Sequence, residues 1–510
     1  MHNLLIHNDN TPFIKSFKSS IQFSASSDID NYISTDIIPK IKAKTPDIIF
    51  IKDNLSSNYL ELYGFRLAYH VRFEEKLKFV PIVILSDLDG FTLNRLESSA
   101  KILFTQNIFI IENSKKAFDD FDVKKMKSFN EENYKSKFLD LISVEAPENS
   151  SSHSIANEWA IYRWSKYLKV ESEAIIKNRE KIASMLYFKY LLAKNPIEIK
   201  KKNGIQFVPR PPENSGKILY IDDEWAKGWS DVFEQYFSKN KNIEFETFEY
   251  DFKENNKFTM ISSIKNRCLA YNPDVVILDL RLTQSDHESI DVNNLTGIKI
   301  TEIIKEINPA IQIIMLTATG KSTILENLYQ HGILGYIKKE HPADIGMSTK
   351  ESFDKLKTLV DKGLDKKYLK EVWEIQQSIK PFSPDIKIEV DSVFEILNSD
   401  MKNRFIYAMF AIFKVIEIIN DKYFEDGYKK ATWKDTNEEI LDNSTKNKIQ
   451  LILNKRLHLN NQKVYEGIEN IIKIRNNTIH PKHGKIEIIQ KDSIIEWFKM
   501  LQTILEKIEK

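Results

Sequence analysis

Five polar positions follow short apolar runs in the middle of this sequence, and their side chains are of types that handle phosphate. Asp222 and Asp223 follow KILYI, Asp279 follows VVIL, Thr317 follows IIML, and a lysine follows GYI. Three carboxylates gathered in one place repel one another unless a cation joins them, and an oxygen-only set suits Mg2+. A carboxylate beside Mg2+ can attack a phosphoryl group while the metal and the lysine neutralise the developing charge. These residues therefore predict phosphoryl transfer to an aspartate.

The elements that must position these residues are parallel strands. Five short apolar runs lie within residues 217–340, namely KILYIDDE, IEFETFE, DVVILDLRL, IQIIMLTA and LGYIKK. Amphipathic segments with helical spacing, such as TGIKITEIIKEIN, separate several of them. Apolar strands that alternate with helices imply a parallel sheet covered on both faces. In such sheets the reactive groups lie at the carboxyl ends of the strands, so we expect the five positions to converge.

Over roughly 125 residues this region resembles the receiver domain of two-component response regulators. The resemblance is carried by the acidic pair, PDVVILDLRL, IIMLTATG and GYIKKE, and the family spacing selects Lys339 over Lys338. It implies a flavodoxin-like, doubly wound parallel sheet and a histidine kinase or another phosphodonor as partner. The residue roles that the resemblance implies are Asp279 as the phosphorylated residue, Asp222, Asp223 and Asp279 as Mg2+ ligands, and Thr317, Tyr336 and Lys339 as switch residues.

Two features depart from the receiver pattern. Glu340 follows the lysine where the family usually has proline. Between Asp279 and Gly297, the segment TQSDHESIDVNN is longer than usual and acidic. We expect this loop, residues 283–295, to overhang the phosphorylation pocket and to slow the entry of a phosphodonor.

The first 115 residues repeat the strand pattern with altered chemistry. NLLIHND, PDIIFIKDN and VPIVILSD align with KILYIDD, PDVVILDLR and IQIIMLTA, which indicates a second copy of the fold. Asn8 replaces one acid and leaves Asp9, Lys52 stands where Asp279 stands, and Ser86 stands at the threonine position. An ammonium at Lys52 would fill the space of the metal and pair with Asp9. We therefore predict a degenerate pseudo-receiver that is not phosphorylated and that serves dimerisation or partner binding.

The composition limits the remaining classes. A chain of 510 residues is expected to form two to four domains, and 42% hydrophobic with 29% charged residues is typical of a folded protein. A net charge of +1 provides no global field for nucleic acid. Cys268 is the single cysteine, which excludes an intrachain disulfide and a multi-cysteine metal site. No disulfide-linked partner is expected. Because the sequence has neither a signal-peptide pattern nor a membrane-length apolar run, we expect a cytoplasmic protein.

Three shifts in composition divide the chain. APENSSSHS is one break, the proline-rich KNPIEIKKKNGIQFVPRPPENSG predicts a semi-rigid connector, and KPFSPD marks a softer break. The stretch between the first two breaks has helical spacing and predicts a helical hairpin packed on a neighbouring domain. The predicted domains are a pseudo-receiver at 1–145, a helical linker with the connector at 146–216, a receiver with its connecting helix at 217–372, and a helical bundle at 373–510.

Past residue 385 the strand pattern fades, and four helical segments predict an all-α bundle. In VYEGIENIIKIRNN, four apolar residues from Val464 to Ile472 form a stripe at helical spacing. Arg475 continues this stripe three residues further on. A buried guanidinium must meet a carboxylate, carbonyl groups or a phosphate. Arg475 is therefore predicted to point toward the core or an interface.

The segment RNNTIHP resembles the Arg-x-x-x-x-His motif of HEPN domains, which are dimeric helical bundles, many of them metal-independent ribonucleases. Arg475 matches the arginine, Asn476 the polar residue often found beside it, and His480 the histidine. The resemblance implies a homodimer formed through the C-terminal bundle, an RNA substrate, and no metal at this site. His480 would move protons at the RNA 2'-hydroxyl or the leaving 5'-oxygen, and Arg475 would stabilise the scissile phosphate. Asn476 would orient the histidine or a phosphate oxygen.

Two hypotheses follow. The first is a receiver-regulated HEPN-type endoribonuclease, switched by phosphorylation or by a partner, for which neighbouring phage-defence genes would be supporting context. The alternative is a non-enzymatic response-regulator adaptor, whose bundle mediates dimerisation or partner binding. In that case Arg475 and His480 only stabilise the dimer.

Overall fold

The computed structural model divides the chain into two compact units. The first comprises Met1–Arg210, Glu224–Tyr236 and Lys338–Asp354, and the second comprises Pro211–Asp223, Phe237–Ile337 and Lys355–Lys510. The residues that the structure describes are 2–8, 13–24, 27–147, 150–196, 201–202, 205–206, 208–252, 256–288, 292–318, 322–342, 348–479 and 488–508.

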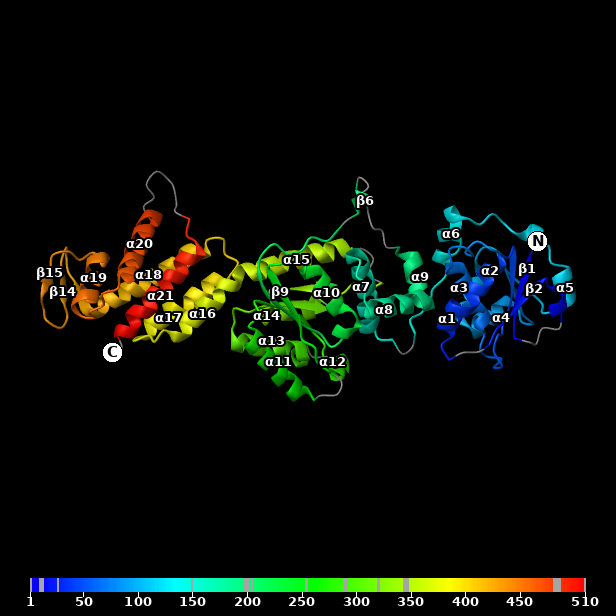
Figure 1. The fold of residues 1–510 in the computed structure, drawn as a ribbon, viewed down its shortest axis with the longest axis horizontal. Helices are drawn as coiled ribbons and strands as arrows, with labels where there is room; N and C mark the ends of the chain where they lie inside the picture. The colour runs from blue at the N-terminus through cyan, green and yellow to red at the C-terminus, as the bar shows by residue number, and fades with distance from the viewer. Residues whose placement is uncertain are drawn as a thin grey trace. The chain divides into compact units, whose positions relative to one another are not determined.

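The first unit begins with an α/β domain (Figure 1). Its strands form because runs such as NLLIH and IIFIK are rich in β-branched and other large apolar residues. Its elements in chain order are β1 (Asn3–His7), η1 (Ile14–Ser16), β2 (Ser19–Gln22), α1 (Ile29–Tyr32), η2 (Ile33–Ile37), α2 (Ile38–Lys44), β3 (Ile48–Lys52), α3 (Tyr63–Phe73), β4 (Ile82–Leu85), α4 (Gly90–Leu96), η3 (Ser98–Phe104), β5 (Ile108–Ile111), α5 (Lys115–Asp119), η4 (Val123–Lys125), α6 (Glu131–Lys137) and η5 (Leu139–Leu141).

The five strands of this domain form one parallel sheet in the order β2-β1-β3-β4-β5. Neighbouring residues of one strand point to opposite faces, so Ile49 and Ile51 join one apolar cluster while Ile48 and Phe50 join another. The sheet is therefore buried on both faces, as the sequence predicted. Strand β2 was not predicted, because its sequence SSIQ has only one large apolar residue.

Three helices follow, α7 (Ser152–Leu168), α8 (Glu173–Ser184) and α9 (Leu186–Lys194), where a hairpin of two was expected. They pack on the first domain through a buried polar network. Asp30 accepts hydrogen bonds from Arg66 Nε at 2.6 Å, from His70 Nε2 at 2.9 Å and from the backbone amide of Leu186 at 2.8 Å. The first residue of α9 is thus bonded directly to the N-terminal domain.

A second parallel sheet begins after the connector. Its strands again pair in parallel, and the whole of the central strand VVILD is buried. The elements from the connector onward are β6 (Lys201–Lys202), β7 (Ile205–Gln206), β8 (Gly216–Ile221), η6 (Trp225–Lys227), α10 (Trp229–Phe237), β9 (Ile243–Thr247), α11 (Lys257–Tyr271), β10 (Val275–Asp279), α12 (Gln284–Glu288), η7 (Val292–Asn294), α13 (Thr296–Ile307), β11 (Gln312–Thr317), α14 (Ser322–Gln330), β12 (Gly335–Lys338) and α15 (Thr349–Asp365).

The order of this second sheet is β12-β11-β10-β8-β9. Numbered along the chain, both sheets have the order 2-1-3-4-5, which is the flavodoxin-like arrangement. The structure thus confirms two flavodoxin-like parallel sheets. It places the carboxyl ends of β8, β10, β11 and β12 at one edge of the second sheet.

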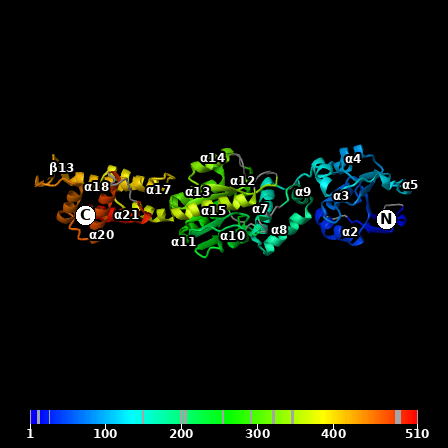
Figure 2. The same ribbon diagram turned by 90° about the horizontal axis from the view of Figure 1, so that it is seen from above.

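The C-terminal region of the second unit is mainly helical. Helix α18 is central and packs against α17, α19, α20 and α21, and Figures 1 and 2 show α18, α20 and α21 side by side. The elements of this region are η8 (Lys366–Tyr368), α16 (Leu369–Ser378), α17 (Pro384–Asn398), α18 (Arg404–Tyr423), β13 (Phe424–Asp426), β14 (Ala431–Trp433), β15 (Glu439–Ile440), α19 (Thr445–Lys455), α20 (Gln462–Ile479) and α21 (Lys491–Ile508).

The second sheet and this helical region share a core. Ala310, in the loop before β11, belongs to the same apolar cluster as the helices α16 to α21. Lys366, in the turn after α15, donates to the Asn398 carbonyl at 2.6 Å, and Tyr368 packs on Phe405. The receiver sheet is therefore joined to the bundle by packing as well as by the chain.

The prediction of an all-α C-terminal region was wrong in one respect. Between α18 and α19 the chain forms an antiparallel sheet in the order β13-β14-β15. Trp433 of β14 is fully buried against Phe424, and the Arg456 guanidinium lies over its ring at 4.4 Å. These strands are only two or three residues long, which is too short for an alternating pattern to be seen in the sequence.

None of the helices in the described part of the chain combines the length and the apolar character that a membrane crossing requires.

Candidate functional site

A tyrosine of β8 donates a hydrogen bond to one residue of the acidic pair that follows this strand. Asp222 is fully buried and its Oδ2 accepts a hydrogen bond from the Tyr220 hydroxyl at 2.8 Å. Burial raises the pKa of Tyr220, and the nearby Asp222 carboxylate raises it further, so the phenol keeps its proton and acts as the donor. Tyr220 was not singled out in the sequence, where it appeared only as an apolar strand residue.

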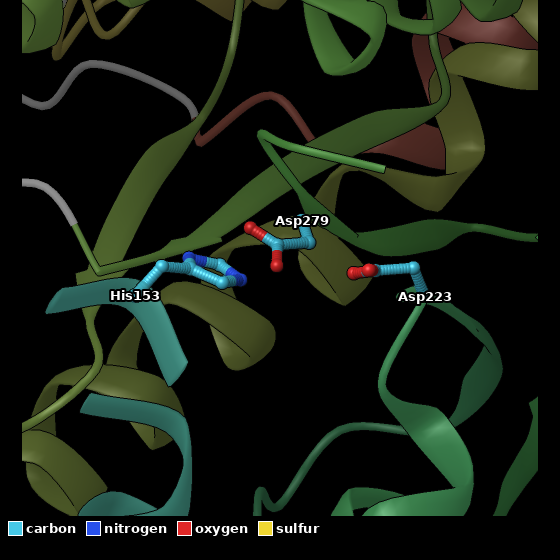
Figure 3. A group of neighbouring side chains, drawn as sticks. All are labelled: His153, Asp223 and Asp279. Carbon is cyan, nitrogen blue, oxygen red and sulfur yellow. The ribbon is translucent and has the colours of Figure 1, made fainter. Parts of the chain in front are cut away.

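Asp279 ends the central strand and faces the acidic pair. A carboxylate oxygen of Asp223 lies within 4.8 Å of one of Asp279, and Figure 3 shows the two side chains coming from the loop after β8 and from the end of β10. The third labelled residue, His153, belongs to α7 of the other unit. The Leu280 amide donates to Asp279 Oδ1 at 2.6 Å, which fixes the orientation of the carboxylate.

These carboxylates fit a hard divalent cation. All the side-chain atoms in question are oxygens, Asp222 and Asp279 are fully buried, and like charges this close are costly without a counter-charge. The donor set is that which Mg2+ takes in proteins. Asp222, Asp223 and Asp279 are therefore the residues that would hold it.

A glycine allows the next helix to approach the strand end. A Cβ built on Gly297 would lie 2.6 Å from the Asp279 carbonyl oxygen and 2.7 Å from the Leu280 Cα. The Gly297 amide donates to the Leu280 carbonyl at 3.1 Å. Only glycine fits here, because any side chain would push α13 away from the end of β10.

Of the three predicted switch residues, two lie at strand ends and one lies within a strand. Thr317 is the last residue of β11 and is buried, and Lys339 directly follows β12 and is also buried, with its ammonium 5.6 Å from the Trp229 ring centroid. Tyr336 lies within β12 and is half-buried. Its ring is capped by the Lys355 ammonium at 3.9 Å and packs edge-on against Tyr329.

One carboxylate of the acidic loop is a structural anchor. Asp286 is fully buried and accepts from the amides of Leu282 and Thr283, while its other oxygen accepts from the amide and the hydroxyl of Thr296. Asp286 thus ties the start of the loop to the first turn of α13. The sequence signal for this anchor is Thr283-x-x-Asp286, a local capping pattern within the loop that was predicted to overhang the pocket.

Glu340 has partners that explain its departure from the family proline. It is 3% exposed, and it accepts from the Trp164 indole at 2.9 Å and from the Thr349 hydroxyl at 2.9 Å. The Arg163 guanidinium pairs with it at 2.8 Å. Burial raises the pKa of Glu340, while Arg163 and these hydrogen bonds favour its charged form. Trp164 and Arg163 belong to α7, so the residue serves a contact that lies outside the receiver itself.

The corresponding edge of the N-terminal sheet has different groups. Lys52 ends β3 and its ammonium donates to Asn8 Oδ1 at 3.0 Å. Asp53 follows it and accepts from the Ser86 hydroxyl at 2.5 Å. Burial raises the pKa of Asp53, although the Ser86 hydrogen bond opposes this. The predicted partner of Lys52, Asp9, lies outside the described residues.

The predicted C-terminal site is described in part. Arg475 of α20 is half-buried, its guanidinium lies 4.8 Å from the Phe413 ring centroid of α18, and its Nη1 donates to Asn476 Oδ1 at 3.1 Å. Its Nε is buried, with no acceptor among the described residues. Asn476 is exposed, and His480 lies outside the described residues. Of the predicted stripe, Val464, Ile468 and Ile471 are buried and Ile472 is half-buried.

The fold and the first of these sites define a class of protein. The sheet order 2-1-3-4-5 is typical of receiver domains. So are an acidic pair after the first strand and an aspartate at the end of the third, which the second sheet carries. Family comparison agrees: residues 3–111 match the model of the inactive receiver domain, and residues 246–347 match that of the response regulator receiver domain. The chain contains two receiver-type domains and is a signalling regulator.

No curated protein matches the sequence. Among solved structures, a signal receiver domain from Vibrio parahaemolyticus is 19% identical with a TM-score of 0.22, covering 31% of this chain and 96% of that chain. The receiver domain of a modulated diguanylate cyclase from Desulfovibrio desulfuricans G20 is 13% identical with a TM-score of 0.21, covering 31% and 98%. With TM-scores this low, the likenesses add nothing to the assignment, which rests on the family models and the sheet topology.

Proposed function

We propose that this chain is a phosphorylation-controlled regulator, that Asp279 accepts the phosphoryl group, and that the C-terminal bundle is a HEPN-type endoribonuclease under its control. The observation that supports the input is the placement of Asp222, Asp223 and Asp279 at one sheet edge, with Asp223 and Asp279 oxygens within 4.8 Å of each other. The N-terminal sheet has Lys52 in place of the acceptor and is a pseudo-receiver without phosphoryl chemistry.

The input reaction is a displacement at phosphorus. The Asp279 carboxylate oxygen forms the new bond to phosphorus. The bond from phosphorus to the donor's imidazole nitrogen or carboxylate oxygen breaks, and that donor atom leaves with the electron pair. Asp222, Asp223 and Asp279 would hold Mg2+, which would supply positive charge to offset the charge that develops on the phosphoryl group. The Leu280 amide fixes one Asp279 oxygen, so the other is the nucleophile. Lys339 and Thr317 would then bind the oxygens of the aspartyl phosphate.

The route to the output runs through packing within the second unit. Helix α15 continues through η8 into α16, and Ala310 places the loop before β11 in the core of the bundle. Interiors this tightly packed do not deform gradually, so a shift of β11 or α15 is transmitted to the helices that pack on them. Phosphorylation would therefore alter how the bundles of two chains pair.

The proposed output is cleavage of RNA at Arg475, Asn476 and His480. The internal 2'-hydroxyl attacks the adjacent phosphorus, its proton passes to the base, and the 5'-oxygen leaves as it takes up a proton; imidazole titrates near working pH and suits both steps. Arg475 supports this role because its guanidinium is only partly satisfied among the described residues, by Asn476. No metal takes part at this site in the proposal.

The test is RNA cleavage by the full-length protein. Purified chain is incubated with total RNA, with and without acetyl phosphate and Mg2+, beside Arg475→Ala and His480→Ala. We expect both variants to lose on the order of 100-fold or more in rate. Lys499→Ala, which removes an exposed basic residue of α21 that pairs with Glu371, is the matched control and should cleave like the wild type. Equal cleavage by all four proteins would reject the catalytic assignment.

One observation favours the non-enzymatic adaptor. The Arg475 guanidinium lies over Phe413, and such a cation–π contact stabilises a bundle without any chemistry. In that case no RNA is lost under any condition, and acetyl phosphate changes only the association state of the chain, which sedimentation of the same samples measures.

A further inference from the structure

A cleft of about 1210 Å3 lies in the first unit, between the N-terminal domain and helix α9. Its walls come from the end of α3 and the loop after it, from α6 and η5, and from α9 and the residues that follow. Most small-molecule sites have volumes of roughly 300–1,000 Å3. The cleft is slightly larger than that, so it has room for a long ligand.

Hydrogen bonds hold α9 against the N-terminal domain. The Lys189 ammonium donates to the Ser34 hydroxyl at 2.9 Å and to His70 Nδ1 at 3.0 Å. The Tyr190 hydroxyl, on the next residue of the helix, donates to the Ile142 carbonyl at 3.2 Å. Both walls of the cleft are therefore positioned by the fold itself, before any ligand enters.

Much of the lining is apolar. Tyr134, Leu139 and Leu191 are buried, while Phe73 and Leu192 are half-buried. Covering such side chains with another apolar group removes their surface from water, which is favourable. The body of a fitting ligand is therefore apolar.

All four carboxylates that line the cleft are already paired with lysines. The ion pairs are Glu74 with Lys42, Glu75 and Glu131 with Lys78, and Asp140 with Lys135. Because each carboxylate has a cation beside it, the lining does not favour a cationic ligand.

Two lysines of α9, Lys189 and Lys194, also line the cleft, and neither pairs with a carboxylate in the part of the chain that the structure describes. Lys194 donates to the Tyr190 hydroxyl at 2.7 Å. Lys189 uses two of its three N–H donors on Ser34 and His70. Burial lowers the pKa of Lys189 to about 8, because an ammonium away from water is less stable. An anion in the cleft would offset this loss.

We propose that this cleft binds a small amphipathic acid, whose apolar body lies against the aromatic and leucine side chains and whose carboxylate meets Lys189 and Lys194. The N-terminal sheet has Lys52 where a phosphoryl acceptor would stand, so such a ligand would give this domain an input of its own. The inference goes beyond the proposed function and depends neither on phosphorylation of Asp279 nor on RNA cleavage.

The test is calorimetric titration of the full-length chain with decanoate, beside three matched probes. Decanol has the same body without the charge, decyltrimethylammonium has the opposite charge, and acetate lacks the body. We expect decanoate to saturate one site per chain. Decanol and decyltrimethylammonium should bind at least roughly 10-fold more weakly, because they lose the charge-assisted hydrogen bonds. Acetate should show no measurable binding, because it buries almost no apolar surface.

Variants of the lining separate the two parts of the ligand. Lys189→Met and Lys194→Gln should each weaken decanoate binding roughly 5- to 50-fold and leave decanol binding unchanged. Lys189→Met also removes bonds that hold α9, whereas Lys194 is exposed and its variant should keep the fold. Leu192→Ala should weaken both ligands roughly 3- to 10-fold. Lys177→Gln, which breaks an exposed pair with Glu173 on α8 outside the cleft, is the matched control and should bind like the wild type.

Several results would overturn the proposal. They are the absence of saturable decanoate binding, equal affinity for decanoate and decanol, and wild-type affinity in both lysine variants. A loss in Lys177→Gln as large as that in Lys194→Gln would reduce the effect to general charge and overturn the site. A short peptide with an apolar C-terminus that binds more tightly than decanoate would overturn the ligand class. The gain of a phosphoryl group at Asp279 is measured separately, so the failure of either proposal is recognised by itself.

Discussion

The two parallel sheets of this chain have the same strand order, but their central strands end in residues of opposite charge. In each, a glycine near the start of the following helix lies against the end of that strand: Gly64 donates to the Asp53 carbonyl and Gly297 to the Leu280 carbonyl. The residue that ends the strand is Lys52 in one sheet and Asp279 in the other. The backbone arrangement is thus shared, while the group presented to a phosphoryl donor is reversed.

A second shared feature lies at the opposite end of the helix. Arg72 and Lys305 each stand nine positions after the first residue of α3 and α13, respectively. Arg72 is buried and Lys305 is half-buried, and both donate to carbonyl oxygens of the next loop. Burial lowers the pKa of Arg72 to about 9 and that of Lys305 to about 8, so both remain charged at neutral pH. Both sheets thus share a cation that bonds the loop after this helix, while the residues at their strand ends differ.

The largest expected effect separates the two strand ends. Asp279→Asn removes the nucleophile and should abolish phosphorylation by acetyl phosphate, read as the gain of one phosphoryl group by intact mass. Lys52→Asp should not create a second site, because Asn8 still replaces an acid and the neighbouring Asp53 is bonded to Ser86. Peptide mapping locates any label, and a phosphoryl group on the N-terminal sheet of Lys52→Asp would contradict the prediction.

Removing these two cations should destabilise each sheet separately. Arg72→Met leaves at least three carbonyl oxygens without their donor, those of Lys78, Val80 and Asn107, and is expected to lower stability by roughly 3 to 6 kcal/mol. Lys305→Met leaves two and should lose roughly 2 to 4 kcal/mol. Both losses of stability are measured by comparing hydrogen exchange in β3 and β4 with that in β10 and β11. The sheet without the substitution is the internal control. Equal exchange in the variants and the wild type would mean that the cations do not support the frame.

The glycines at the strand ends should tolerate no side chain. In Gly64→Ala the Cβ would lie 2.7 Å from the Asp53 carbonyl oxygen, so we expect a loss of roughly 1 to 3 kcal/mol from overpacking. Gly297→Ala should lose about as much, and should also slow phosphorylation because it pushes on Asp279. Gly90→Ala is the matched control, since its nearest neighbour would be Leu103 Cδ1 at 3.6 Å. Thermal unfolding that is the same for all three variants would contradict the close approach.

The smallest effect is a difference in pH dependence between the sheets. Burial lowers the pKa of His70 to about 4, although the Asp30 hydrogen bond opposes this, whereas the ordinary value is 6.5. The unfolded chain therefore binds a proton between pH 6.5 and pH 4 that the folded chain does not, so stability falls as the pH is lowered through this window. Between pH 7 and pH 5 we expect a loss of roughly 2 kcal/mol. Hydrogen exchange in the N-terminal sheet, corrected for the intrinsic effect of pH, should lose this dependence in His70→Gln.

How far the sequence predicted the site can be seen from particular residues. Asp222, Asp223, Asp279 and Thr317 were placed correctly at strand ends, because apolar strand runs are local signals and parallel strands end at one edge. Asp286, in the loop that was predicted to overhang the pocket, is buried. The local pattern Thr283-x-x-Asp286 indicates one of its contacts, but the contact with Thr296 lies ten residues further on and has no local signal.

By itself the sequence determined the two parallel sheets and the acid cluster of the second sheet. It also determined that Lys52 stands in the first sheet where Asp279 stands in the second. Each of these follows from strand periodicity and from the residue type at a strand end. The tertiary structure alone decided that Glu340 bonds to α7, that Arg72 turns inward, and that a small sheet interrupts the bundle. The physical reason is that a buried charge can lie only where its partners are, and two partners of Glu340, Trp164 and Arg163, come from a helix about 176 residues away. Such pairings are set by packing between distant segments, which no local pattern encodes.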